Sequence, residues 1–248
     1  MALFSYYLLP KKTVVLIMCS MRSGSTLLKA LLAEAHDVSN LPEIDFRQFL
    51  SHKYRLYNQA YYLSKKRIVV LKFPHPFLGA RDKQFIQQTD RMKIIVLVRD
   101  VPGVVKSLEK MPKEAKFNFM GKKEYLNYWC DVYESILDSV RLMKRKIYFV
   151  RYEDLIKNPK AVTKEIFSFI GSEKQEGAET YHKPKNFEWG WGHDDGGEEI
   201  KKLRVLPDGD RIDEVDSELE AMIAGSSRVS YLREKFGYGA PVTSKAGR

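Results

Sequence analysis

The stretch TVVLIMCSMRSGSTLL, from Thr13 to Leu28, decides the fold. Its first part, Thr13–Cys19, is apolar and rich in β-branched side chains, which is typical of a strand buried on both faces. Short hydroxyl-bearing residues around Gly24 then form a turn, and strong helix formers follow over Thr26–Ala35. A buried strand, a tight turn and a helix in immediate succession predict the first βα unit of a parallel sheet.

The same alternation continues along the chain. We expect further buried strands over Ile68–Phe73, Lys93–Val98 and Ile147–Val150. Further helices are expected over Val101–Lys110, Glu124–Met143, Asn158–Ile170, Asp213–Ala224 and Arg228–Phe236. Asn158 followed by Pro favours the start of its helix, and Gly171 favours its end.

These elements predict an α/β fold with a P-loop-like, doubly wound parallel sheet flanked by helices. The chain is then a single domain over residues 1–248, with a core at about 13–171 and a C-terminal lid with short helices at about 172–248. Hydrophobic residues make up 44% and charged residues 30%, which excludes a mainly disordered or fibrous chain. No apolar run reaches about 18 residues, so we expect no membrane span.

The net charge is compatible with an anionic ligand and equally with simple solubility. Lysine and arginine total 42 against 32 acidic residues, so the formal charge is +10. Such a chain attracts nucleic acid, acidic lipid, or phosphorylated and sulfated small molecules. The basic runs are scattered along the sequence, whereas a nucleic-acid-binding protein would gather them on one face, so we expect no nucleic-acid partner. Nothing in the sequence indicates an oligomeric state.

Cysteine usage and the N-terminal residues favour a cytoplasmic protein. Cys19 and Cys130 both lie in apolar surroundings and are expected to be buried thiols, with neither a disulfide framework nor a four-cysteine zinc site. The first residues hold a short apolar patch without preceding charges or a small-residue cleavage site, so no signal peptide is expected. No metal-ligand cluster such as H-E-x-x-H is present, and we expect no metal requirement.

The turn between the first strand and the first helix has the composition of an anion cradle. Backbone N–H groups at a helix N-terminus point at an anion there, and the helix dipole favours negative charge. The hydroxyls of Ser23, Ser25 and Thr26 add donors, Gly24 permits the tight turn, and Arg22 adds a positive fork. The GxxxxGK[ST] pattern is absent, so a P-loop kinase-like phosphotransferase is the alternative reading rather than the leading one.

Arg22–Leu27 resembles the 5′-phosphosulfate loop of sulfotransferases that use 3′-phosphoadenylyl sulfate (PAPS). Its Arg-Ser-Gly-Ser-Thr-Leu sequence is similar to the loop of the tyrosylprotein, carbohydrate and bacterial branches, whereas the cytosolic branch carries a lysine. The resemblance implies in-line transfer of the sulfuryl group from PAPS to a hydroxyl acceptor, releasing adenosine 3′,5′-bisphosphate (PAP). It also implies that Arg22–Leu27 holds the 5′-phosphate and the sulfuryl group.

The second resemblance follows the third strand. Arg99 stands at the carboxyl end of a strand, where open α/β sheets bind ligands, and Ser107 follows eight residues later. The segment is similar to the family's Arg-Asp/Asn-Pro-x-Asp-Val-Val-x-Ser pattern, which implies that Arg99 and Ser107 bind the 3′-phosphate. Gly103 takes the place of the usual aspartate in that pattern.

A third resemblance lies after the fourth strand, where Arg151–Leu155 reads RYEDL as in the family. It implies that Tyr152 approaches the adenine, while the two acids after it are structural. Residues Trp189–Arg204 are similar to the loop with which the family covers the nucleotide, which implies that Lys201 or Lys202 reaches a phosphate. A non-catalytic nucleotide- or nucleic-acid-binding protein is a further alternative.

Sulfuryl transfer needs positive charge at the leaving phosphate and a base for the acceptor proton. Arg22 and Lys72 are the candidates for the positive charge, since Lys72-Phe73-Pro74 resembles the Lys-x-Pro element of the arginine-loop branches. The preferred base is Glu43, which lies about as far from the loop as the base of the tyrosylprotein branch. His75, placed like the base of the cytosolic branch, is the second candidate, and Asp45 is the third. The acceptor is a small molecule, a sugar or a peptide hydroxyl.

Overall fold

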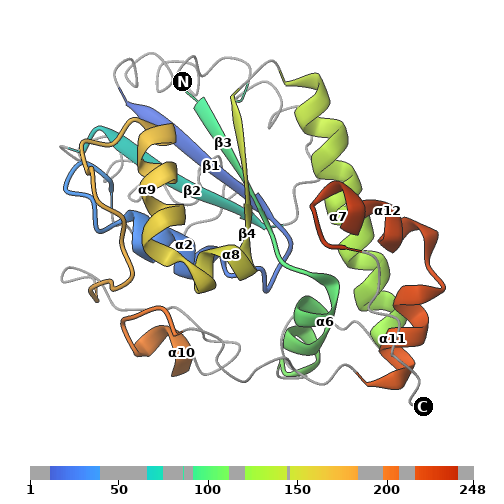
Figure 1. Cartoon of the computed structure of the whole chain (residues 1–248). Helices are drawn as coiled ribbons and strands as arrows, with labels where there is room; N and C mark the ends of the chain where they lie inside the picture. The colour runs from blue at the N-terminus through green and yellow to red at the C-terminus, as the bar shows by residue number, and fades with distance from the viewer. Residues whose placement is uncertain are drawn as a thin grey trace, which may run out of the picture.

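A four-stranded parallel sheet forms the centre of the protein (Figure 1). The computed structural model describes residues 12–39, 66–74, 86, 92–111, 121–143, 146–183, 198–206 and 216–239. The strands are β1 (Thr13–Cys19), β2 (Ile68–Pro74), β3 (Met92–Val98) and β4 (Ile147–Arg151), in the order β2-β1-β3-β4. All three pairings are parallel, so every strand ends at the same edge of the sheet. Each predicted strand is confirmed to within one residue at either end. The predicted burial of β4 is wrong, because β4 lies at the edge of the sheet: only Val150 is buried there, and Phe149 is 49% exposed.

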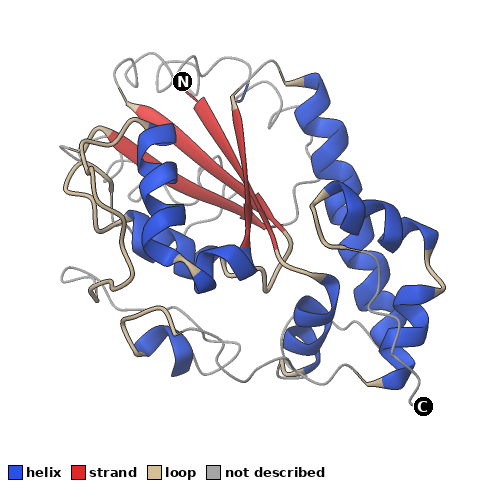
Figure 2. Cartoon of the chain, viewed as in Figure 1, coloured by secondary structure: helices blue, strands red, loops and turns tan. Residues whose placement is uncertain are grey.

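Helices cover both faces of the sheet (Figure 2). The described helices are α2 (Ser25–Leu32), α6 (Val101–Glu109), α7 (Lys122–Leu142), α8 (Tyr152–Lys157), α9 (Pro159–Ile170), α10 (Glu198–Lys201), α11 (Ser217–Ala224) and α12 (Ser227–Lys235). Successive side chains of β1 point to opposite faces. Val14, Leu16 and Met18 pack in a core with α6, α7, α11 and α12, and the residues between them pack with α2, α8 and α9. The doubly wound α/β fold is therefore confirmed.

Two short helices, one cap and the bounds of two helices differ from the prediction. Helix α2, expected to reach Ala35, ends at Leu32. Helix α8 follows β4 without a loop, and α10 lies in the tail; both are too short to show a helical periodicity in the sequence. Asn158 is at once the last cap of α8 and the first cap of α9, and its side chain makes no capping hydrogen bond. Gly171 ends α9 in the left-handed conformation, with a φ of 77°, as predicted. Helix α11 begins later than predicted, at Ser217, because Asp216 accepts from the Leu219 N–H and caps it.

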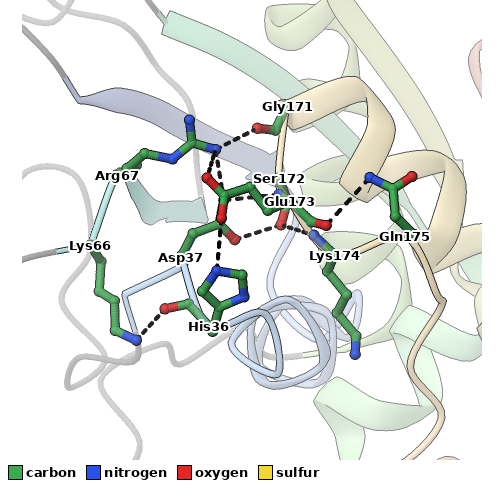
Figure 3. Close-up of polar contacts among 9 residues, drawn as sticks. All are labelled: His36, Asp37, Lys66, Arg67, Gly171, Ser172, Glu173, Lys174 and Gln175. Carbon is green, nitrogen blue, oxygen red and sulfur yellow. Dashed lines mark hydrogen bonds and ion pairs between the residues drawn. The ribbon is translucent and has the colours of Figure 1, made fainter.

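At the edge where the strands begin, a buried aspartate connects the start of β2 to the residues after α9 (Figure 3). Asp37, whose side chain is 4% exposed, accepts from the Ser172 hydroxyl at 2.6 Å, the Glu173 N–H at 3.0 Å and the Arg67 guanidinium at 3.1 Å. Burial alone raises the pKa of Asp37, but these hydrogen bonds outweigh it and hold the pKa below its usual value. Arg67 precedes β2 and Ser172 follows α9, so this network fastens the sheet at the edge opposite the strand ends.

Both cysteines are buried free thiols, as predicted. Burial raises the pKa of Cys130 to about 11. Within the described ranges, no helix is both long and apolar enough to cross a bilayer. The same ranges contain no group of three or more His, Cys, Asp or Glu side chains placed to hold a metal ion.

Candidate active site

The turn between β1 and α2 is tight because two residues adopt left-handed backbone conformations. Arg22 has a φ of 62° and Gly24 a φ of 87°. A side chain at Gly24 would place its Cβ 2.5 Å from Cδ2 of Tyr152, so only glycine lets the Tyr152 ring lie against the turn. Gly24 is also the N-cap of α2, and without a side chain it leaves the first N–H groups of the helix to other acceptors. This is the geometry of the predicted anion cradle.

The hydroxyls of the turn divide into an inner and an outer set. Ser20 and Ser23 are fully buried, with their Oγ atoms 2.5 Å apart and the Ser23 Oγ 3.1 Å from the Tyr133 hydroxyl. Ser23 therefore points into the protein, and what it offers a ligand is its backbone N–H. Ser25 and Thr26 begin α2 and are half-buried.

The two predicted phosphate segments meet in the structure. The Arg22 Nε donates to the Ser107 Oγ at 2.9 Å, and the Arg99 Nη1 donates to the Arg22 carbonyl at 3.1 Å. Arg22 thus bridges the turn after β1 and the first helix after β3. Two guanidinium groups lie at one edge of the sheet, at the carboxyl ends of its two central strands.

Arg99 lies between the first turn of α6 and the ring of Tyr152. Its guanidinium carbon is 4.5 Å from the centroid of that ring. On the other side, a Cβ added to Gly103 would come within 2.7 Å of the Arg99 Nε. Glycine in place of the family's usual aspartate therefore gives the arginine room to lie against α6. Tyr152 in turn contacts both the turn at Gly24 and Arg99.

Lys72 extends the site toward the edge strand β2. It pairs in register with Ile17 of β1, and its Nζ donates to the Thr26 Oγ1 at 3.2 Å. A lysine two residues before the end of β2 therefore reaches the first turn of α2. The predicted positive groups Arg22 and Lys72 both lie at the turn.

The two acids after Tyr152 are structural, as predicted. Glu153 accepts from the Asp100 N–H at 3.0 Å and from the Tyr238 hydroxyl at 2.6 Å. Asp154 pairs with the Arg151 guanidinium through two hydrogen bonds of 2.7 and 2.9 Å. Asp100, which follows Arg99 in the sequence, is likewise held by two hydrogen bonds from the guanidinium of Arg233 on α12.

Several predicted site residues are not tested by these contacts. Glu43, Asp45 and His75 lie outside the described residues, as does most of the predicted lid. Lys201 and Lys202 are described and exposed, at the end of α10, which lies in the lower part of Figure 1. Their segment is held by an antiparallel bridge between Thr180 and Arg204.

Three side chains that the sequence does not single out support the turn after β1 and the end of β3. Tyr128, Trp129 and Tyr133 of α7 hydrogen bond to the turn after β1 or to the end of β3. In the sequence they form part of an amphipathic stripe and are indistinguishable from ordinary core aromatics. Two of them carry a hydroxyl and the third an indole N–H, which buried aromatics usually satisfy, and this was the available signal.

Solved structures of sulfotransferases have a similar fold. A sulfotransferase domain from the curacin biosynthetic pathway is 16% identical with a TM-score of 0.61, and covers 93% of this chain and 99% of its own. A sulfotransferase domain from the olefin synthase of Synechococcus PCC 7002 is 19% identical with a TM-score of 0.63, over 94% and 96%. A sulfotransferase from Alicyclobacillus acidocaldarius is 12% identical with a TM-score of 0.55, over 92% and 97%.

Sequence comparison supplies the family. No curated protein sequence gives a significant match. In contrast, the profile of the family described as "Sulfotransferase domain" matches residues 12–188, well over half of the chain, and includes all three motifs. The fold, the motifs and the profile agree, and the chain belongs to the sulfotransferase domain family.

Proposed function

We propose that this PAPS-dependent sulfotransferase holds its donor across the edge where Arg22, Arg99 and Ser107 meet. The observation that carries the proposal is the 2.9 Å hydrogen bond from Arg22 to Ser107, since it joins the two segments that would hold the two ends of PAPS. In this assignment, residues 22–27 hold the 5′-phosphosulfate and Arg99 with Ser107 holds the 3′-phosphate. Two arginines and a helix N-terminus fit a ligand with several negative charges.

The turn contributes to binding mainly through its backbone. The N–H groups from Ser23 through Leu27 would point at the 5′-phosphate, with Gly24 allowing the close approach. Thr26 adds a hydroxyl beside the Lys72 ammonium. Tyr152 would flank the adenine, since its ring already lies against the turn and under Arg99. Lys201 or Lys202 would complete the site from a lid within residues 172–248 of a single domain.

Sulfuryl transfer needs positive charge at the leaving phosphate and a base at the acceptor hydroxyl. Charge grows on the leaving phosphate oxygen as the bond to sulfur breaks, and Arg22 and Lys72 are the groups proposed to stabilise it. The acceptor hydroxyl must lose its proton to a base. Glu43 is the proposed base and His75 the second candidate. PAPS supplies the sulfuryl group. The residues of this chain bind PAPS, align it with the acceptor hydroxyl and take up the acceptor proton.

The arginine-containing loop also supports a proposal about the branch of the family. Arg-Ser-Gly-Ser-Thr-Leu resembles the loop of the tyrosylprotein, carbohydrate and bacterial branches, and we propose that the chain belongs with them. The acceptor is a hydroxyl of a small molecule, a sugar or a peptide. A labelled-PAPS assay over a panel of such acceptors distinguishes among the three classes.

The role of Lys72 is tested by Lys72→Ala. Removing a charge that acts on the leaving oxygen lowers turnover by about 10²–10³. The loss is smaller with a PAPS analogue whose leaving group is less basic, because less charge then needs stabilising. Lys164→Ala, an exposed lysine on α9, is the matched control and leaves turnover unchanged. An equal loss with both donors would show that Lys72 does not act on the leaving group.

A further inference from the structure

We infer that helix α7 sets the distance between the two phosphate-binding segments, with Tyr128, Trp129 and Tyr133 as positioning residues. The inference rests on the proposed function, because it concerns the two sites assigned there. None of the three side chains is expected to touch PAPS: their exposures are 7%, 0% and 0%. They act through the residues that do, namely the turn after β1 and the end of β3.

Tyr133 fixes the inner side of the turn through hydrogen bonds whose direction is determined. Its hydroxyl lies 3.0 Å from the Leu97 carbonyl, which can only accept, so the Tyr133 proton is committed to Leu97. Toward Ser20 and Ser23, at 3.3 and 3.1 Å, Tyr133 therefore accepts. One serine donates to Tyr133 and the other to its serine neighbour, so all three hydroxyl protons are used inside the protein. Burial raises the pKa of Tyr133 to about 12, which keeps the phenol protonated.

Tyr128 and Trp129 hold the backbone on either side of the site. The Tyr128 hydroxyl accepts from the Met21 N–H at 2.9 Å, next to Arg22. The Trp129 Nε1–H donates to the carbonyl of Arg99 at 3.0 Å. Helix α7 is therefore hydrogen bonded both to the residue before Arg22 and to the backbone of Arg99.

The helix is rigid enough to transmit this spacing. Residues 128 to 133 span about 7.5 Å along the helix axis, a distance fixed by its hydrogen bonds. The rings of Trp129 and Tyr133 pack edge to face at 5.0 Å, and the Tyr133 ring packs on Phe236 at 5.3 Å. The hydrogen bonds to Met21 and to Arg99 thus come from one packed group of side chains on α7.

A fixed spacing matters only for a ligand that uses both sites at once. PAP carries a 5′- and a 3′-phosphate, and the second phosphate binds with no new loss of translational freedom if its site is already in place. Adenosine 5′-monophosphate and adenosine 3′-monophosphate each need one site. Removing an α7 hydrogen bond should therefore lower the affinity for PAP more than the affinity for either monophosphate. General damage to the fold should lower all three affinities alike.

The test is calorimetric titration of wild type, Tyr128→Phe, Tyr133→Phe and Tyr148→Phe with the three nucleotides. Tyr148→Phe is the matched control, because its hydroxyl bonds to Glu165 on α9, away from the site. We expect PAP affinity to fall about tenfold in Tyr128→Phe, the usual effect of one lost hydrogen bond, and at least as far in Tyr133→Phe, which loses more than one. Affinity for the monophosphates should stay within about threefold in both variants. Tyr148→Phe should match wild type. If Tyr133→Phe does not fold, Tyr128→Phe carries the test.

Two results overturn the inference. Equal losses for PAP and both monophosphates would mean that the tyrosines act only on local structure, and unchanged PAP affinity would mean that α7 does not position the segments. A wild type that binds none of the three nucleotides would instead overturn the proposed site itself, so the two failures are distinguishable.

Discussion

The side chains of Arg22 and Ser107 are hydrogen bonded, Nε to Oγ at 2.9 Å, although 85 residues separate them in the sequence. The contact joins a turn that follows β1 to a helix that follows β3. In a parallel sheet, neighbouring strands end at the same edge, so residues distant in sequence meet there. The contact brings together the two motifs that the family resemblance assigns to opposite ends of PAPS.

The turn should not tolerate a side chain at Gly24. Gly24→Ala would place a methyl group 2.5 Å from the Tyr152 ring and in a left-handed conformation that costs alanine about 1 kcal/mol. We expect loss of PAP binding and a lower free energy of unfolding, measured by calorimetry and urea titration. Gly239→Ala is the control, because an added Cβ there meets nothing within 4 Å. Normal PAP affinity in Gly24→Ala would contradict the close packing of Tyr152 on the turn.

The proposed base is tested by Glu43→Gln, which keeps the shape of the side chain and removes its basicity. PAP affinity should stay within a few-fold of wild type while turnover falls by about 10²–10⁴, the usual contribution of a positioned base. The defect should shrink with a more acidic acceptor, whose proton is lost more easily. Steady-state assays with labelled PAPS measure both effects.

His75→Asn is the companion to that experiment and should cost little turnover. The opposite pattern, with Glu43→Gln near normal and His75→Asn inactive, would assign the base to His75. The chain would then combine an arginine-containing loop with the base of the cytosolic branch.

Asp37 should make stability depend on pH in the acid range. Its folded pKa lies below its unfolded value, so its contribution is present above the unfolded pKa, near 4, and is lost as pH falls through the folded pKa. Asp37→Asn should therefore lower the free energy of unfolding by about 2 kcal/mol at pH 7, with the difference from wild type shrinking below about pH 4. Asp138→Asn, an exposed acid on α7, is the control. A pH-independent difference in urea titrations would show that the carboxylate charge is not involved.

Local patterns were sufficient to predict the sheet. The runs that became β1 to β4 are short and apolar, so each strand was located to within one residue at either end. Burial was predicted less well, because nothing in the local pattern shows that β4 is the edge strand. The phosphate segments could also be recognised, because Arg22 to Leu27 and Arg99 to Ser107 are contiguous. Helix α8 was missed since it is only six residues long and directly continues a strand.

The contacts of α7 could not be predicted for a different reason. The Met21 N–H and the Tyr128 hydroxyl are 107 residues apart, and nothing in either local sequence indicates the other as its partner. The same holds for Asp37 and Ser172, which are 135 residues apart. Such pairs depend on how the chain packs in three dimensions, whereas strand and turn patterns depend on neighbouring residues.

The most direct test of the donor site is calorimetry of PAP and adenosine 5′-phosphosulfate in EDTA, with wild type, Arg99→Ala and the control Arg141→Ala, an exposed arginine on α7. We expect wild type and the control to bind PAP without metal, since arginines and backbone N–H groups supply the positive field. Arg99→Ala should weaken PAP by at least about tenfold and adenosine 5′-phosphosulfate, which lacks the 3′-phosphate, much less. Binding that needs added metal, or an equal loss for both ligands in Arg99→Ala, would contradict the proposed site.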